Sequence, residues 1–298
     1  MAAKGRPRRF AIDVHSHIRV MAVEELTARN LPRGGGAGKQ DWVGKDSIAA
    51  QEAHLRKSRS KHTNPKTRLR DMDRMGIDIQ VISLNLRQSC YWADGAKGAE
   101  IARVCNDGIA EFVAQAPDRF IGMGSVALQD VRRANAEMNR CVADLGFKGV
   151  VVASNVRNKD LGEARFKSFW ARAEALGVPV FVHPQGFTHP ERLQKYFLWN
   201  SIGQPLEEAL AMSSLVHEGV MDAHPKLKVC IDHGGGYLPF YAGRADRAFH
   251  TRPEAQVASK PLSAYMRGFF YDTVFYDRKM LAFLVDKVGA GRILLGTD

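Results

Sequence analysis

Two histidines near the start of the chain have a spacing that suits metal binding. His15 and His17 follow an apolar, β-prone run that begins at Phe10. Alternate residues of a strand point to the same face, so both imidazoles would project together from the strand end. Two neutral imidazoles a few ångströms apart provide half of a transition-metal site. Taken alone, such a pair is more often a pair of surface or capping residues, so the metal-binding interpretation depends on later segments.

Three later apolar runs end in residues of the same kind. They carry His183, His233 and Asp298. In an α/β barrel the chemistry gathers at the carboxyl ends of the strands. A single histidine at a strand end is usually structural. Four strand ends with ligand-type residues in one chain favour a functional site.

The elements that must position these residues alternate between apolar β-prone runs and helical patterns, which predicts an α/β fold. The eight expected strands are 10–15, 77–84, 120–128, 147–153, 178–183, 227–233, 269–275 and 293–298. The expected helices are 67–75, 97–115, 130–144, 163–176, 206–221 and 278–288. The simplest assembly is a (β/α)8 TIM barrel formed by one domain, residues 1–298. A doubly wound open sheet is the alternative, but its glycine-rich nucleotide fingerprint is missing after the first strand.

A long polar segment, about 18–65, interrupts the alternation after the first strand. It carries Gly34, Gly35 and Gly36 together with many lysines and arginines. The segment is too long for an ordinary connection between a strand and a helix, so we predict a lid or insertion. The three glycines follow no strand, and we interpret them as a flexible hinge or loop.

Composition narrows the class of protein. The chain has 298 residues, is 45% hydrophobic and has a formal net charge of +11, which fits a globular protein with a sizeable core. The positive charge is compatible with binding to nucleic acid, to an anionic membrane surface or to a small anionic substrate, or with a solvated surface that has no such partner. No RNA-binding or helix-turn-helix signature is found, and basic residues do not alternate with aromatic ones. We therefore expect no nucleic-acid partner.

Other sequence features bear on location. No run approaches the roughly 20 apolar residues of a membrane helix, so no membrane partner is expected. The basic N-terminus lacks the apolar stretch of a secretory signal. Cysteines are scattered without a C-x-x-C motif, at Cys90, Cys105, Cys141 and Cys230. This usage predicts reduced thiols and a cytoplasmic location.

The segments that carry the candidate ligands match a known pattern. They are Asp13-Val14-His15-Ser16-His17, Val182-His183-Pro184, His233-Gly234-Gly235-Gly236 with Gly243-Arg244, and Leu295-Gly296-Thr297-Asp298. Together they resemble the amidohydrolase superfamily, and within it the metal-dependent decarboxylases similar to aminocarboxymuconate-semialdehyde decarboxylase. The matches span almost the whole chain. They are more specific for the superfamily than for the decarboxylase branch.

This resemblance implies one divalent metal ion, expected to be zinc, with manganese as the alternative. Its ligands would be His15, His17, His183 and Asp298, and water would take an open position. Binuclear relatives need a carbamylated lysine at the end of the fourth strand. Residues 151–155 contain no lysine, so a mononuclear site is expected.

The resemblance also implies roles for three further residues. His233 would be the acid–base residue beside the metal-bound water, the alternatives being a fifth ligand or a structural imidazole. Arg244 would hold a substrate carboxylate, in the relatives partly across a dimer interface, so a homodimer is expected. A surface ion pair with Asp246 is the other reading of Arg244. Arg56 is a looser match to a second carboxylate-binding arginine, and Arg59 competes for that role.

The chain departs from the pattern of these decarboxylases in two places. Residues 196–205 differ from the corresponding run in the relative, and we expect them to line the pocket and to change the substrate. Gln88, Tyr91 and Trp92 could line it too, or could serve in ordinary packing. The second departure is the end at Asp298, where the family continues with a Tyr-Pro turn and a closing helix. We expect a longer polypeptide or a fragment, and weak metal binding by a chain that ends here.

These observations predict a metal-dependent decarboxylase that acts on a small anionic substrate, an unsaturated or aromatic carboxylate. The metal–water unit and His233 would deliver a proton to the carbon that bears the carboxylate. A hydrolase or hydratase of the same fold is the alternative, because the same ligands serve both reactions. A non-catalytic or nucleic-acid-binding protein is a third hypothesis, which would predict strongly salt-dependent binding to DNA or RNA.

Overall fold

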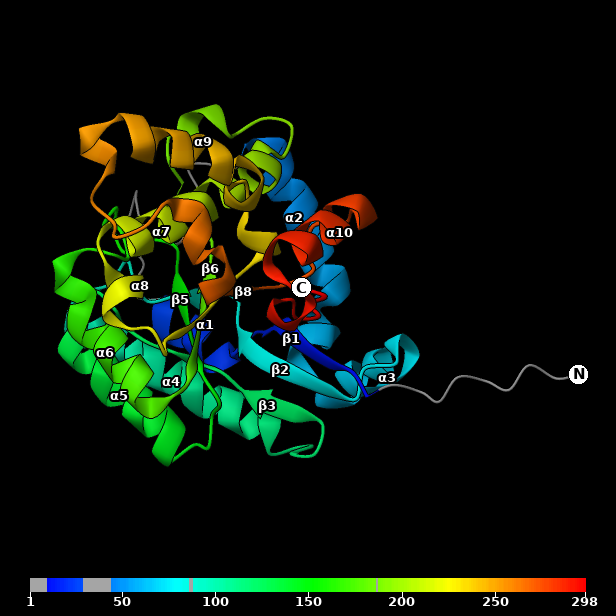
Figure 1. Ribbon diagram of the computed structural model, residues 1–298. Coiled ribbons are helices and arrows are strands. Elements are labelled where there is room, and N and C mark those ends of the chain that lie inside the picture. Colours follow the sequence, from blue (N-terminus) through cyan, green and yellow to red (C-terminus); the bar gives the residue numbers. More distant parts are fainter. Residues whose placement is uncertain (1–9, 29–43, 86–87, 186) are drawn as a thin grey trace, which may run out of the picture.

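Parallel strands form the centre of the molecule and helices surround them (Figure 1). The computed structural model describes residues 10–28, 44–85, 88–185 and 187–298. The strands are β1 (Ile12–Ile18), β2 (Ile79–Leu84), β3 (Phe120–Gly122), β4 (Gly124–Ser125), β5 (Val150–Ala153), β6 (Pro179–His183), β7 (Lys228–Ile231) and β8 (Phe269–Tyr271). They pair in the orders β1-β2-β3 and β4-β5-β6-β7-β8, and every pairing is parallel.

Two sets of backbone hydrogen bonds connect these strands around the barrel. Met123 alone separates β3 from β4, and its N–H donates to the carbonyl of Ile82 at 2.9 Å. At the other side, Leu294 donates to Tyr271 of β8 and Val14 of β1 donates to Leu295, both at 2.8 Å. Residues 293–298 therefore lie between β8 and β1. The predicted (β/α)8 barrel architecture is confirmed.

The last expected strand needs a correction. Residues 293–298 form only one isolated bridge, Tyr271–Ile293, instead of a regular strand. At this point the side chain of Thr273, and not the backbone of a neighbouring strand, forms hydrogen bonds with the backbone of Gly296. Its hydroxyl accepts from Gly296 N at 3.1 Å and lies 3.2 Å from Gly296 O.

The helices agree with the pattern and end at recognisable signals. They are α1 (Met21–Ala28), α2 (Lys45–Thr63), α3 (Pro65–Met75), α4 (Gly95–Val113), α5 (Val131–Ala143), α6 (Lys167–Leu176), α7 (Gln204–His217), α8 (Val220–Ala223), α9 (Leu238–Thr251) and α10 (Arg278–Val288). Gly76 and Gly177 close α3 and α6 in the left-handed conformation, with φ of 73° and 66°. The expected helix 206–221 is divided into α7 and α8 by Gly219, whose φ is 75°. Helix α9 was not expected from the sequence.

The alternation of side chains along the strands builds two apolar layers. One cluster lines the inside of the barrel and contains Val81, Met123, Val151, Phe181 and Cys230. The larger cluster lies between strands and helices, and every residue of β5 is buried because both of its faces are covered. The inner cluster fills the barrel below its mouth. Polar residues at the carboxyl ends of the strands, above this cluster, therefore face a common space at the mouth.

The predicted polar excursion after the first strand is largely helical where the structure describes it. It contains α1 and α2, while residues 29–43, with the three glycines at 34–36, lie outside the described residues. The end of α2 is tied to the end of β1. Arg19 N donates to His62 O at 3.0 Å, and His62 Nδ1 donates to His17 O at 3.1 Å. The segment is thus anchored beside the first candidate ligands.

Two further features of the described residues bear on location. None of the described helices has the length and the apolar character needed to cross a bilayer. All four cysteines are buried and free.

Candidate metal centre

The first strand places both of its histidines at the mouth of the barrel. The pairing of β1 with β2 shifts register between Asp13 and Ser16. At such an irregularity the strict alternation of side chains is interrupted, so two consecutive residues can face the same side of the sheet. Val14 packs against the inner cluster, and the ring of the next residue, His15, lies beside the ring of His17, with the two centroids 5.0 Å apart.

Four predicted ligands converge at this point. The ligand atoms of His15, His17, His183 and Asp298 all lie within 4.8 Å of one another. Asp298 Oδ1 is 3.5 Å from His15 Nε2 and 3.4 Å from His17 Nε2. Two ligands bound to one zinc ion at about 2.1 Å lie roughly 3.4 Å apart in tetrahedral geometry. The arrangement therefore has the dimensions of a site for one ion.

Hydrogen bonds at the far side of each ring fix which nitrogen faces the site. His17 Nδ1 lies 3.0 Å from Leu84 O, and His183 Nδ1 lies 3.2 Å from Pro184 O. A carbonyl oxygen only accepts, so each Nδ1 carries the proton and each Nε2 presents a lone pair. His15 Nδ1 lies 2.6 Å from Asp272 Oδ2, which gives His15 the same tautomer.

One close contact shows that this set of donors fits a cation. His15 Nε2 lies 3.0 Å from His17 Nε2. When each ring carries only its Nδ1 proton, two lone pairs face each other at this distance and repel, whereas a second proton on His15 would lie between them. A cation placed between them would turn the repulsion into two bonds. The residues present therefore fit the metal ion that the sequence pattern implies.

The charges of these groups also suit ligands. Burial and the neighbouring His17 and His15 hold the pKa of His183 well below its usual value, so its ring is neutral. Burial would raise the pKa of Asp298, but the imidazoles of His17 and His233 outweigh it and lower that pKa. Burial likewise opposes protonation of His15, but Asp232 and Asp272 raise its pKa to about 9. The excess negative charge around His15 attracts a proton or a metal ion.

His233 lies beside these four residues and contacts a buried carboxylate. Its Nδ1 is hydrogen-bonded to Glu208 Oε1 on α7, and its Nε2 is 3.9 Å from Asp298 Oδ2. Burial raises the pKa of Glu208 to about 7. Burial would lower the pKa of His233, but the Glu208 carboxylate raises it. The pairing with Glu208 therefore favours the protonated form of His233 beside the candidate ligands.

A glycine turn sets the position of His233. Gly234, Gly235 and Gly236 have φ of 68°, 81° and 59°. A Cβ at Gly236 would lie 2.1 Å from Pro205 O, at the start of α7. Only glycine allows this approach. His233 itself has φ of 48°, a strained conformation that is typical of functional sites.

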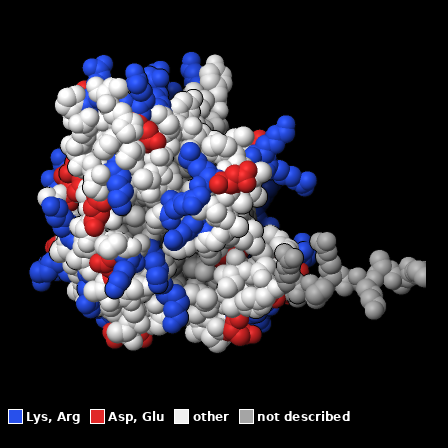
Figure 2. Space-filling view, viewed as in Figure 1, with Lys and Arg blue, Asp and Glu red and all other residues white. Residues whose placement is uncertain are grey.

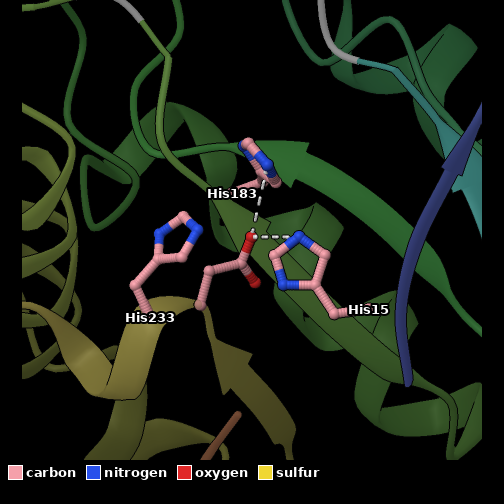
Figure 3. A group of neighbouring side chains, drawn as sticks. His15, His183 and His233 are labelled. Carbon is pink, nitrogen blue, oxygen red and sulfur yellow. Dashed lines mark ion pairs between the residues drawn. The ribbon is translucent and has the colours of Figure 1, made fainter. Parts of the chain in front are cut away.

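Sequence reasoning missed several carboxylates around the centre. Asp13 accepts hydrogen bonds from Thr297 Oγ1 and Gln80 Nε2, both at 2.7 Å, and so holds the segment that ends in Asp298. Asp272, Glu208 and Asp232 were also not singled out. Figure 3 shows His15, His183 and His233 around one carboxylate, that of Asp232, with ion pairs to the first two.

The two predicted arginines lie outside this cluster. Arg56 is on α2, with its side chain 73% exposed and its Nη1 3.8 Å from Glu52 Oε2. Arg244 is exposed on α9. Asp246, the alternative partner of Arg244, accepts instead from Ser263 N.

The other expected pocket residues differ in what they contact. Gln88 binds the backbone of Val20 through both ends of its amide, which is a structural role. Tyr91 is buried, and its hydroxyl accepts from Ala153 N at 3.4 Å. Trp199 of the divergent segment is buried in a small separate cluster with Leu193.

Comparisons with known proteins agree with this geometry. The Amidohydrolase family profile matches residues 12–298. The chain belongs to the amidohydrolase superfamily. A 2-amino-3-carboxymuconate-6-semialdehyde decarboxylase from Dictyostelium discoideum is 33% identical over 300 residues, which covers 98% of this chain and 82% of the relative. A gamma-resorcylate decarboxylase from Rhizobium radiobacter is 32% identical over 247 residues, covering 78% of this chain and 75% of the relative.

Solved structures of this amidohydrolase group match the whole barrel. A 2,6-dihydroxybenzoate decarboxylase complexed with 2,6-dihydroxybenzoate superposes with a TM-score of 0.82 at 26% identity, covering 97% of this chain and 88% of the other. A dihydroxybenzoic acid decarboxylase from Polaromonas, with bound manganese and 2-nitroresorcinol, gives 0.79 at 27% identity, covering 97% and 86%. The predicted membership of the metal-dependent decarboxylase branch is confirmed.

Proposed function

We propose that this amidohydrolase removes a carboxyl group from an aromatic or unsaturated carboxylate with the help of one divalent metal ion. The observation that carries the proposal is the convergence of His15, His17, His183 and Asp298, with the His233–Glu208 pair beside them. The names of the relatives support the reaction class, since they are decarboxylases of a carboxymuconate semialdehyde and of dihydroxybenzoates.

The metal ion, His233 and Glu208 would have different roles in such a reaction. When bound, the ion would act as a Lewis acid that draws electron density from the substrate's oxygen atoms. His233 donates a proton to the carbon that bears the carboxylate. The bond from this carbon to the carboxylate then breaks, its electron pair returns to the substrate, and CO₂ leaves. Glu208 holds the His233 ring in place and favours its protonated form.

The identity of the ion and of the partners stays part of the proposal. Zinc is the expectation from the family pattern, while manganese is the ion bound in the Polaromonas neighbour. We propose that Arg244 and Arg56 bind the anionic end of the substrate and that Arg244 does so in a homodimer. Figure 2 shows lysines and arginines over much of the face viewed, which would favour an anionic substrate. The lid role of the 18–65 segment and a cytoplasmic location are predictions of the same kind.

The decisive experiment measures CO₂ release from a panel of hydroxybenzoates and carboxymuconates. The chain is assayed as purified, after treatment with a chelator, and after addition of Zn²⁺ or Mn²⁺. We expect release that depends on the ion and that is lost in a His233→Asn variant with unchanged metal content. Cleavage of lactones or amides without CO₂ release would instead identify a hydrolase.

A further inference from the structure

Asp232 lies at the mouth of the barrel, beside the ring nitrogens that face the metal site. In β7, Cys230 belongs to the inner cluster, so Asp232, two residues later, faces the same space one layer higher. The Asp232 side chain is 0% exposed. Among the described residues, neither of its carboxylate oxygens has a hydrogen-bond partner. Burying an unpaired carboxylate costs several kcal/mol, on the order of the whole stability of a domain.

The nearest polar atoms are the nitrogens that face the metal site. Asp232 Oδ2 lies 3.7 Å from His15 Nε2 and 3.7 Å from His183 Nε2 (Figure 3). These distances are too long for hydrogen bonds. Because the Nδ1 atoms of both rings donate elsewhere, their Nε2 lone pairs point to a negative oxygen. Three electron-rich atoms face one another here, as they do around a metal ion.

We propose that Asp232 is a further ligand of the metal ion that His15 and His183 bind. The inference deepens the proposed function, since it concerns the same centre. Besides the four predicted ligands, His15, His183, Asp232 and His233 form a second group whose ligand atoms lie within 4.8 Å of one another. The two groups share His15 and His183. Each of these nitrogens has one lone pair, so the groups describe one ion and not two.

A second carboxylate changes the chemistry of the centre. Two aspartates balance the charge of a divalent ion, where one would leave a net positive charge. Three imidazoles and two carboxylates leave room for one further ligand in a six-coordinate site. Zinc in proteins is almost always four-coordinate in structural sites, while manganese suits octahedral sites rich in oxygen. We therefore expect the centre to favour Mn²⁺ more than a site with four protein ligands would.

The test compares wild type with Asp232→Asn, which keeps the shape of the side chain and removes its charge. Binding of Mn²⁺ and of Zn²⁺ is measured by competition with a chelator. We expect Asp232→Asn to lower the affinity for Mn²⁺ at least about tenfold, which is about 1.4 kcal/mol, and to lower that for Zn²⁺ less. In the Co²⁺-loaded protein, the visible absorption should become more intense, because the coordination number falls.

The unfolding temperatures of the metal-free proteins provide a second test. The variant that binds metal more weakly should be the more stable one when no metal is present. Removal of an unpaired buried charge should raise the unfolding temperature of metal-free Asp232→Asn above that of metal-free wild type. If Asp232 were instead a structural partner of a protonated His15, the same variant would be less stable without metal and would bind Mn²⁺ as wild type does. That result would overturn the inference.

A matched control separates a ligand from a supporting residue. Asp272 is also a buried carboxylate beside His15, but it contacts Nδ1 on the far side of the ring. Asp272→Asn should weaken metal binding and leave the shape and intensity of the Co²⁺ spectrum unchanged. If wild type binds no divalent ion, the proposed function fails as well. If wild type binds one ion and Asp232→Asn gives the same affinity and spectrum, only the role of Asp232 is overturned.

Discussion

His15 Nδ1 and Asp272 Oδ2 lie 2.6 Å apart at the carboxyl end of the barrel, although the two residues are 257 positions apart in the chain. The other oxygen of Asp272 accepts from Gly234 N at 3.3 Å and from Val274 N at 3.1 Å. One carboxylate thus connects the first strand, the last regular strand and the turn that carries His233. It fixes the tautomer of His15 and so the direction of its Nε2 lone pair.

Asp272→Asn should lower metal affinity by about 10–100-fold. The amide oxygen of asparagine would accept from the backbone N–H groups, which leaves its NH₂ group facing His15 Nδ1. Two donors cannot pair, so in the metal-free protein the His15 proton would move to Nε2, where it competes with the ion for that nitrogen. Titration with Mn²⁺ or Zn²⁺ measures the effect, with Asp286→Asn on the exposed face of α10 as the control. An unchanged affinity would show that Asp272 does not orient His15.

Glu208→Gln should change the pH profile of the reaction and leave the metal content unchanged. The Glu208 carboxylate raises the pKa of His233, so its replacement by a neutral amide lowers that pKa. The protonated form of His233, which is the proposed proton donor, is then lost at lower pH. The alkaline limb of kcat/KM should therefore move to lower pH, and above it the rate should fall by about 10²-fold.

Glu207→Gln is the matched control for this prediction. Glu207 is the adjacent residue of α7 and is also buried, but its carboxylate accepts from Thr188 N and from Asn155 Nδ2. Its replacement should leave the alkaline limb in place. Equal shifts in both variants would mean that the profile reports a general effect on α7 and not the pairing with His233.

Arg244→Ala should raise KM for a substrate with an acidic group and leave metal binding unchanged. A guanidinium that holds a carboxylate with two hydrogen bonds contributes about 1.5–3 kcal/mol, or roughly 10–150-fold. Arg247 is exposed on the same helix, so Arg247→Ala is the control for general loss of positive charge. If both variants raise KM equally, the effect comes from long-range attraction, and it should then disappear at high salt.

The sequence pattern identified candidate ligands at positions where the alternation of side chains reached the strand end that the structure shows. His183 ends β6, and His15 and His17 lie in β1. Asp232 and Asp272 follow the same rule, but the predicted strands 227–233 and 269–275 ran past them. The structure ends β7 at Ile231 and β8 at Tyr271, which makes both aspartates residues of the barrel mouth.

Other features depend on tertiary contacts that no local pattern contains. Glu208 reaches His233 because the glycine turn lies against the start of α7, a contact between residues 25 positions apart. The loss of regular strand pairing in residues 293–298 depends on the hydroxyl of Thr273, which forms hydrogen bonds with the backbone N–H and carbonyl of Gly296. Neither contact has a periodic signal in the sequence. Burial of the carboxylates likewise becomes visible only when the helices cover the strands.

Gly236→Ala should destabilise the protein and displace His233. The added Cβ would lie 2.1 Å from Pro205 O at a backbone φ of 59°, so it adds a clash to a conformation that costs about 1–3 kcal/mol for other residues. Gly243→Ala is the matched control, because its Cβ would meet nothing within 4 Å and alanine favours the helix α9 by about 0.5–1 kcal/mol. Thermal unfolding should show a lower midpoint for Gly236→Ala and an equal or higher one for Gly243→Ala. Equal stability of Gly236→Ala and wild type would mean that the turn does not hold β7 against α7.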